Sequence, residues 1–202
     1  MTILSAIHAM PTSALLALLV GETAAHQLAG RPLADVFSLY AEPPLLKETS
    51  TAPEAERILE ASKELLARAL QESMQSRSLL DTPDAVRDYL KLRLADRDHE
   101  VFYGLFLDAQ NRLIADVELF RGTLSQTSVY PREIVKAALG YNAAGVIFAH
   151  NHPSGVSEPS HSDTHLTDML KKTLALEEVR TIDHFIVGGD HSPLSMAEGV
   201  VA

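Results

Sequence analysis

The stretch GVIFAHNHPSGVSEPSHSD, residues 145–163, predicts the centre of the fold and the position of a functional site. Its first five residues, Gly145–Ala149, form a continuous apolar run, which is typical of a strand buried on both faces of a sheet. A loop rich in Ser, Gly and Pro follows. Ser160 then begins a helix, whose apolar positions recur at helical spacing: Leu166, Met169, Leu170 and Leu174.

Two histidines stand at the end of the predicted strand. Side chains two positions apart on a strand point to the same side, so His150 and His152 share one face while Asn151 points to the other. Pro153 cannot donate a hydrogen bond within a sheet and therefore ends the strand. Because sites in open α/β sheets commonly lie at the carboxyl ends of strands, these two imidazoles predict a divalent metal site.

A third ligand is expected from the helix. The short loop brings the chain back toward the strand end, so Asp163, in the first helical turn, can face the histidines. Ser160-x-x-Asp163 also fits a capping box, and the two roles are compatible. Two imidazoles and one carboxylate leave an open position on a tetrahedral zinc ion, the pattern of a site that activates water. We expect one Zn²⁺ per chain, bound by His150, His152 and Asp163.

A hydrolytic site also needs a proton acceptor. Glu100 begins the first strand of the expected sheet and has apolar neighbours, which favour a raised pKa and a general-base role. Glu118, on the following strand, is the alternative, and Glu133 is disfavoured because it begins a helix. Other polar residues near the site have structural explanations: a solvated helix face for His161 and His165, and a core or ligand-supporting position for Asp183 and His184.

Strands and helices alternate in the rest of the second half. We expect Val101–Leu107 and Arg112–Phe120 to form a hairpin, a helix from Pro131 to about Leu139, and a further strand over Thr181–Val187. Together with the central strand and its helix, the order is strand, strand, helix, strand, helix, strand. This order predicts an α/β layer structure with a mixed sheet and flanking helices.

The first part of the chain is predicted to be helical. Ala14–Val20 indicates a buried helix, and the capping box Thr51–Glu54 precedes an amphipathic helix that ends near Met74. Another helix begins at Thr82-Pro83-Asp84. Because Gln75–Asp81 separates the last two helices, we expect a small helical region over 1–75 and an α/β domain over 80–202.

Composition excludes several classes of protein. The chain has no cysteine, so it has no disulfide framework, thiolate zinc finger or cysteine nucleophile. Its net charge is −10 and neither half is basic, which disfavours a surface for nucleic-acid phosphates. The apolar run Leu15–Val20 has no preceding Lys or Arg and is too short to span a bilayer. We therefore expect a cytoplasmic location and no membrane partner.

The residues around the histidines resemble a known family. His150-x-His152-Pro153-x6-Ser160-x2-Asp163 matches the full motif of the JAMM (MPN+) metalloproteases. Short sequence segments around this motif are similar to those of the bacterial RadC family (UPF0758): Gly122-Thr123-Leu124, Pro131-Arg132-Glu133-Ile134, Asn142-Ala143-Ala144, Ala149–Gly155, Pro159-Ser160 and Asp183–Val187. The resemblance covers about the last hundred residues.

This resemblance implies a JAB/MPN fold, which is similar to that of the cytidine deaminases. It implies a zinc hydrolase that cleaves a peptide or isopeptide-like amide bond in a protein or peptide substrate. Zinc would lie on the three residues named above, Glu100 would activate the attacking water, and Ser160 would stabilise the tetrahedral intermediate. The sequence does not give the oligomeric state, so a homodimer is left open.

RadC-like chains also carry a helix–hairpin–helix with glycine turns that bind DNA phosphates, and the family has been called a DNA repair family. Here Glu48–Pro53 replaces the glycine hairpin, so the helical region resembles a degenerate form of that motif. The alternative function is a DNA-repair-associated module that binds nucleic acid or acts as a scaffold with a structural metal. The lost glycines and the acidic charge disfavour it.

Overall fold

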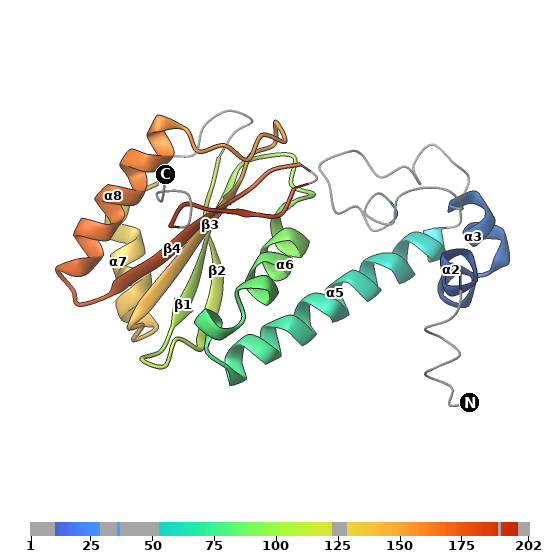
Figure 1. The fold of residues 1–202 in the computed structure, drawn as a ribbon, viewed down its shortest axis with the longest axis horizontal. Helices are drawn as coiled ribbons and strands as arrows, with labels where there is room; N and C mark the ends of the chain where they lie inside the picture. Colours follow the sequence, from blue (N-terminus) through green and yellow to red (C-terminus); the bar gives the residue numbers. More distant parts are fainter. Residues whose placement is uncertain (1–10, 29–35, 37–52, 123–128, 190, 198–202) are drawn as a thin grey trace. The chain divides into compact units, whose positions relative to one another are not determined.

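The structure is a computed structural model that describes residues 11–28, 36, 53–122, 129–189 and 191–197 (Figure 1). The chain divides into two compact units, Met1–Leu66 and Ala67–Ala202, and each is described by itself. The domain limits expected at 75 and 80 stay a prediction. The segment 37–52, with the expected helix cap at Thr51 and most of Glu48–Pro53, lies outside the described residues.

Helices make up the described part of the first unit. Gly21, with a φ of +81°, separates α2 (Thr12–Val20) from α3 (Glu22–Leu28), and α5 (Pro53–Ser76) begins after the undescribed segment. The expected burial of the first helix is wrong, because Leu18 and Leu19 are 66% and 42% exposed. Its inner side packs in a small apolar cluster: Leu16, Ala25, Leu28, Val36 and Leu59. Across the described residues, no helix combines the length and apolar character needed to cross a bilayer.

A five-stranded sheet forms the centre of the second unit, in the order β2-β1-β3-β4-β5. Only β3 and β4 pair in parallel, and the other three pairs are antiparallel, which confirms the mixed sheet. The sequence did not predict the last, two-residue strand. The strands are β1 (Val101–Leu107), β2 (Leu113–Arg121), β3 (Gly145–Asn151), β4 (Arg180–Val187) and β5 (Leu194–Ser195).

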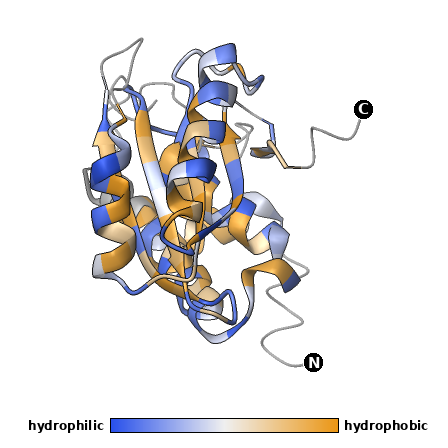
Figure 2. Ribbon diagram, turned by 90° about the vertical axis from the view of Figure 1, so that its left-hand side faces the viewer, coloured by the Kyte–Doolittle hydropathy of each residue, from blue (hydrophilic) through white to orange (hydrophobic). Residues whose placement is uncertain are grey.

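Helices cover both faces of this sheet. A 3-10 turn, η2 (Leu79–Asp81), leads into α6 (Pro83–Leu94) on one face, while α7 (Pro131–Gly140) and α8 (His161–Ala175) cover the other (Figure 1). Alternate side chains of β1 serve the two layers: Leu105 packs in the cluster below α6, and Phe106 packs in the cluster below α7 and α8. The inward sides of these elements are accordingly apolar (Figure 2).

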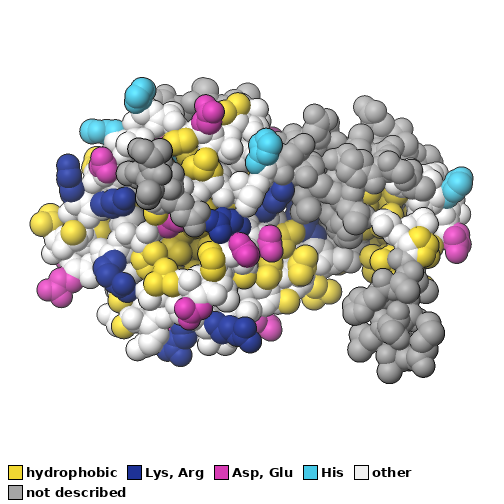
Figure 3. Space-filling model, in the orientation of Figure 1, with side chains coloured by type: hydrophobic (Ala, Val, Ile, Leu, Met, Phe, Trp, Pro, Cys, Tyr) yellow, Lys and Arg dark blue, Asp and Glu magenta, His cyan; other side chains and the backbone are white. Residues whose placement is uncertain are grey.

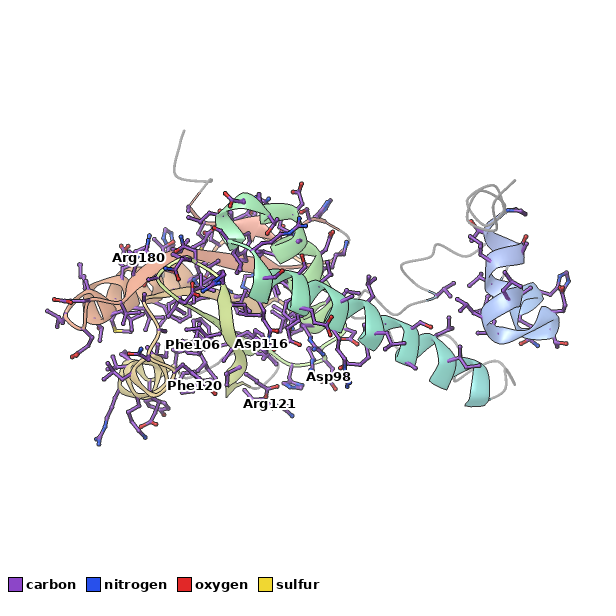
Figure 4. All side chains as sticks on the ribbon, turned by 90° about the horizontal axis from the view of Figure 1, so that it is seen from below. Asp98, Phe106, Asp116, Phe120, Arg121 and Arg180 are labelled. Carbon is purple, nitrogen blue, oxygen red and sulfur yellow. The ribbon has the colours of Figure 1, made fainter. Side chains whose placement is uncertain are left out.

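An irregularity in β2 changes which side chains face each layer. Phe102 pairs with Phe120 and Tyr103 with Glu118, so Leu119 is an extra residue in the ladder. The bulge turns both Leu119 and Phe120 toward the α7/α8 layer. Asp116 and Phe120, labelled in Figure 4, consequently belong to opposite faces of the same strand. Glu118 pairs with Tyr103 and therefore faces the α6 layer.

Candidate metal centre

His150 and His152 converge at the carboxyl end of β3. His150 extends from the α7/α8 face and is 1% exposed. The backbone N–H of His152 donates to the carbonyl of Val187 at 2.9 Å, so β4 holds the chain in place just beyond the strand. The Nε2 atoms of the two histidines lie 2.9 Å apart. The shared face expected from the sequence therefore brings two ligand atoms together.

Asp163 reaches the same point from the first turn of α8. Its Oδ1 lies 3.3 Å from His150 Nε2, and its Oδ2 lies 3.6 Å from His152 Nε2. The capping box is also present, because the Ser160 N–H donates to Asp163 Oδ2 at 2.7 Å and the Asp163 N–H donates to Ser160 Oγ at 3.1 Å. The capping-box interpretation of Ser160-x-x-Asp163 is confirmed, and the same cap aims the carboxylate at the histidines, while its role as a metal ligand stays a prediction.

These three residues form a group that could hold a metal ion. One ligand atom from each, two imidazole nitrogens and a carboxylate oxygen, all lie within 4.8 Å of one another. His152 Nδ1 lies 2.7 Å from the carbonyl oxygen of Val156, which can only accept, so Nδ1 carries the proton. In its neutral form, His152 therefore turns an Nε2 lone pair toward His150 and Asp163. In this form the facing acceptors are placed so that they could share a metal cation, and the donor set fits one.

The charges of the group are coupled. Burial alone raises the pKa of Asp163, but hydrogen bonds that His150 and His152 donate in their protonated forms, together with one from Ser160, outweigh it and hold that pKa well below its usual range. In its protonated form His152 donates from Nε2 to Asp163, and this hydrogen bond raises the pKa of His152, although burial opposes the shift. The carboxylate is therefore ionised at neutral pH and ready to bind a cation.

A cavity of about 870 Å³ is lined in part by His150, His152 and Asp163. Glu100, Ser160, His161 and His165 contribute polar groups to its lining, so the last two histidines lie beside the site as well as on an exposed helix face. The remaining wall is largely apolar: Phe102, Val129, Leu166 and Met169. Pockets of this kind bind ligands through an apolar surface with a few polar groups that orient them.

The three candidate bases differ in position. Glu100 precedes β1, lines the cavity, and contributes to the raised pKa of His152 through its charge. Glu118 faces the other layer and forms an ion pair with Arg121 at 2.7 Å. Glu133 is half-exposed in the first turn of α7 and pairs with Lys136. Of these carboxylates, Glu100 lies beside the ligands, while its role as a base stays a prediction.

Asn151, between the two histidines, links β3 to the segment that carries Glu100. It is 2% exposed, and its Oδ1 accepts from the backbone N–H of Val101 at 2.8 Å. Its Nδ2 donates to the carbonyl of His99 at 3.0 Å. Asn151 thus holds the backbone on both sides of Glu100. Strand periodicity predicts that this side chain points away from the histidines, but it does not reveal the contact.

Glycines allow the loop after β3 to pack closely against the turn after β4. A Cβ atom added at Gly188 would lie 2.8 Å from the backbone of Val156 and Ser157, and one at Gly189 would lie 2.8 Å from the oxygen of Gly155. Such distances exclude side chains at both positions. The close packing places the Val156 carbonyl where it accepts from the Nδ1–H of the His152 ring.

His184 lies behind the site on β4. It is 1% exposed, and its Nε2 lies 2.8 Å from His150 Nδ1. Burial, followed by the charge of His150, lowers its pKa well below the ordinary histidine value, so the ring is neutral. The interpretation that this residue supports a ligand fits its contact with His150. Its neighbour Asp183 instead accepts from the hydroxyl of Ser195 at 2.7 Å.

Comparison with known proteins agrees with this architecture. The model of the RadC-like JAB domain family matches residues 80–201. A UPF0758 protein of Dechloromonas aromatica is 59% identical over 140 residues, which cover 69% of this chain and 62% of the relative. One from Leptothrix cholodnii is 54% identical over 177 residues, which cover 85% of this chain and 79% of the relative. The chain thus spans about 62% of the length of the first of these relatives. It belongs to the RadC (UPF0758) family and has the JAB/MPN fold.

Proposed function

We propose that the protein is a zinc-dependent hydrolase of the JAMM type that cleaves a peptide or isopeptide-like amide bond. The observation that carries the proposal is the convergence of His150, His152 and Asp163 within 4.8 Å, at the base of a cavity that Glu100 also lines. A metal-dependent hydrolase fits the family, and the choice of amide substrates is the finer part of the proposal.

Zinc suits this ligand set, since nitrogen and carboxylate donors in a three-residue site are typical of catalytic zinc. His150 and His152 would each supply Nε2, and Asp163 would supply its carboxylate. When bound, the ion supplies Lewis-acid chemistry that makes water a stronger nucleophile near neutral pH and draws electrons from a carbonyl oxygen.

Glu100 is the proposed general base. Its carboxylate would take a proton from the attacking water and return it to the leaving amine as the C–N bond breaks. The position of Glu100 on the cavity wall and the apolar ring of Phe102 nearby support this role. Asn151 holds the backbone on both sides of the base, which keeps its distance from the ligands constant.

Ser160 is the proposed group for the developing oxyanion. Its hydroxyl now donates to Asp163 Oδ2 at 2.6 Å, so it must turn toward the substrate to serve that role. The hydrogen bond from the Ser160 N–H to Asp163 does not involve the hydroxyl, so this half of the capping box survives the rotation. A substrate side chain next to the scissile bond would meet the apolar wall of Leu166, Met169 and Val129.

The first experiment is metal analysis of protein purified without chelators. We expect about one zinc per chain in the wild type and little in His152→Ala. Zinc-free wild type would overturn the proposal.

The second experiment compares wild type with Glu100→Gln on a mixture of cellular peptides analysed by mass spectrometry. We expect the variant to keep its zinc and to lose about 100- to 10,000-fold in cleavage rate. Equal cleavage by both proteins would exclude Glu100 as the base.

The nucleic-acid alternative gains no support from the drawn surface. Figure 3 shows Lys and Arg interspersed with Asp and Glu over the described residues of that face. A continuous basic stripe is what a phosphate backbone requires. Binding of single-stranded or branched DNA that weakens steeply with salt would restore this alternative.

A further inference from the structure

A chain of short hydrogen bonds runs from α8 through β4 to the first histidine. The Thr167 hydroxyl lies 2.6 Å from the Asp163 carbonyl oxygen, four residues earlier in the helix. The same hydroxyl lies 2.6 Å from Nδ1 of His184, and Nε2 of His184 lies 2.8 Å from Nδ1 of His150. Thr167, His184 and His150 are 4%, 1% and 1% exposed, so water does not compete for these contacts.

The donors and acceptors along this chain can be counted. A hydroxyl has one proton, and a carbonyl oxygen only accepts, so the Thr167 proton goes to the carbonyl of Asp163. The thioether of Met196, 3.7 Å away, is a weaker and more distant acceptor. Thr167 Oγ1 must therefore accept from His184 Nδ1–H. The neutral ring of His184 then has a lone pair on Nε2, which accepts from His150 Nδ1–H.

The last proton assigned along this chain of hydrogen bonds is that of His150, in the proposed metal centre. With its proton on Nδ1, neutral His150 has a lone pair on Nε2, the atom that faces His152 and Asp163. The reverse arrangement would start with Thr167 donating to His184, would place a proton on His150 Nε2, and would abolish its ability to bind a metal. It would also leave the Asp163 carbonyl without the Thr167 proton.

We propose that Thr167 and His184 are positioning residues that hold His150 in the Nδ1–H tautomer, with Nε2 free to bind the metal. This inference rests on the metal site proposed above. The Asp163 carbonyl sets the direction of the first hydrogen bond, so one turn of α8 both supplies a ligand and selects the tautomer of another. Outer partners of this kind commonly strengthen metal binding about 10- to 100-fold.

Packing keeps the central ring in place. The ring of Phe102 meets His184 edge-on with centroids 5.4 Å apart, and the ring of Phe148 does so at 6.1 Å. These apolar rings offer His184 no hydrogen-bond partner on their sides, so its two nitrogens are satisfied by Thr167 and His150.

The test is zinc affinity, measured by competition with a chelator. Thr167→Val keeps the shape of the side chain and removes the hydroxyl, and we expect it to weaken zinc binding about 10- to 100-fold. Thr167→Ser should restore affinity close to that of the wild type. Thr173→Val is the matched control: Thr173 lies on the same helix and donates to the Met169 carbonyl at 2.8 Å, and its variant should bind zinc like the wild type.

Nitrogen NMR of the metal-free protein gives a second readout. We expect His150 in the wild type to carry its proton on Nδ1, and this preference to be lost in Thr167→Val. A proton on Nε2 of His150 in the wild type would overturn the inference, as would equal zinc affinity in Thr167→Val and Thr173→Val. Wild-type protein with no affinity for zinc would instead contradict the metal centre itself, and the NMR result would still decide the tautomer.

Discussion

Two aspartates on opposite faces of the sheet have contrasting surroundings. Asp163 faces the Nε2 atoms of two histidines, whereas Asp116 on β2 receives hydrogen bonds from three donors: the hydroxyls of Tyr89 and Tyr103 and the amide of Gln71. The Asp116 cluster is complete as it stands. The Asp163 group has more acceptors than protons to share among them. Counting protons thus separates a carboxylate with a structural role from one that is placed to bind a cation.

The strongest way to test this contrast is to neutralise each carboxylate. Asp163→Asn preserves shape and can still cap the helix, but an amide is a poor zinc ligand. We expect zinc affinity to fall by more than the roughly 100-fold typical of outer partners, as measured by chelator competition. Asp168→Asn, an exposed position on α8, is the control and should keep its zinc. Retention of zinc by Asp163→Asn would mean that the carboxylate is not a ligand.

The converse change should affect stability instead of metal binding. Asp116→Ala removes the acceptor of Tyr89 and Tyr103 and leaves two partly buried hydroxyls without it. We expect the free energy of unfolding in urea to fall by about 2–3 kcal/mol, with unchanged zinc affinity. Asp84→Ala, at a position whose side chain is 96% exposed, should change stability by less than about 0.5 kcal/mol. A loss of zinc in Asp116→Ala would break the distinction between the two clusters.

Asn151 shares features with both aspartate clusters. Its hydrogen bonds are structural, like those of Asp116, but they hold the backbone of the proposed base Glu100 beside the Asp163 group. Asn151→Ala leaves the N–H of Val101 without its acceptor, and we expect a loss of about 1–2 kcal/mol in unfolding free energy. Zinc affinity should remain near that of the wild type. Asn151→Asp keeps the acceptor for the Val101 N–H and loses the donor to the His99 carbonyl. Its free energy of unfolding in urea should therefore lie between those of the wild type and Asn151→Ala. An Asn151→Ala protein as stable as wild type would show that the contact contributes nothing.

The smallest expected effect appears in alkali. Burial, reinforced by the hydrogen bond to Asp116, raises the pKa of Tyr89 to about 12. The folded state therefore favours the protonated phenol, and the stability this provides is present below pH 10 and is lost as pH rises from about 10 through 12. Unfolding midpoints across this range should fall more steeply in wild type than in Tyr89→Phe. If the unfolding midpoints of the two proteins fell in parallel with pH, the loss of stability in alkali would come from groups other than Tyr89.

Local patterns account for what the sequence predicted of the site. Strand periodicity placed His150 and His152 on one face, and the cap signal placed Asp163 in the first turn of α8. Features that depend on pairing between distant segments were not visible. The Leu119 bulge, the contact of Asn151 with Val101, and the contact of Thr167 with His184 each depend on how two separate elements meet. The expected burial of Ala14–Val20 failed for a different reason: an apolar run alone does not say which of its faces is covered.

Gly188 has a consequence for how this protein tolerates change. Any side chain there would push the loop away from the turn after β4 and move the Val156 carbonyl from His152. A mutational scan scored by function would therefore rank position 188 among the most sensitive, beside the ligands themselves. The residue has no side chain with which to take part in chemistry. Sensitivity at this position reflects the space that the loop requires, and a scan scored by zinc content would group Gly188 with His152.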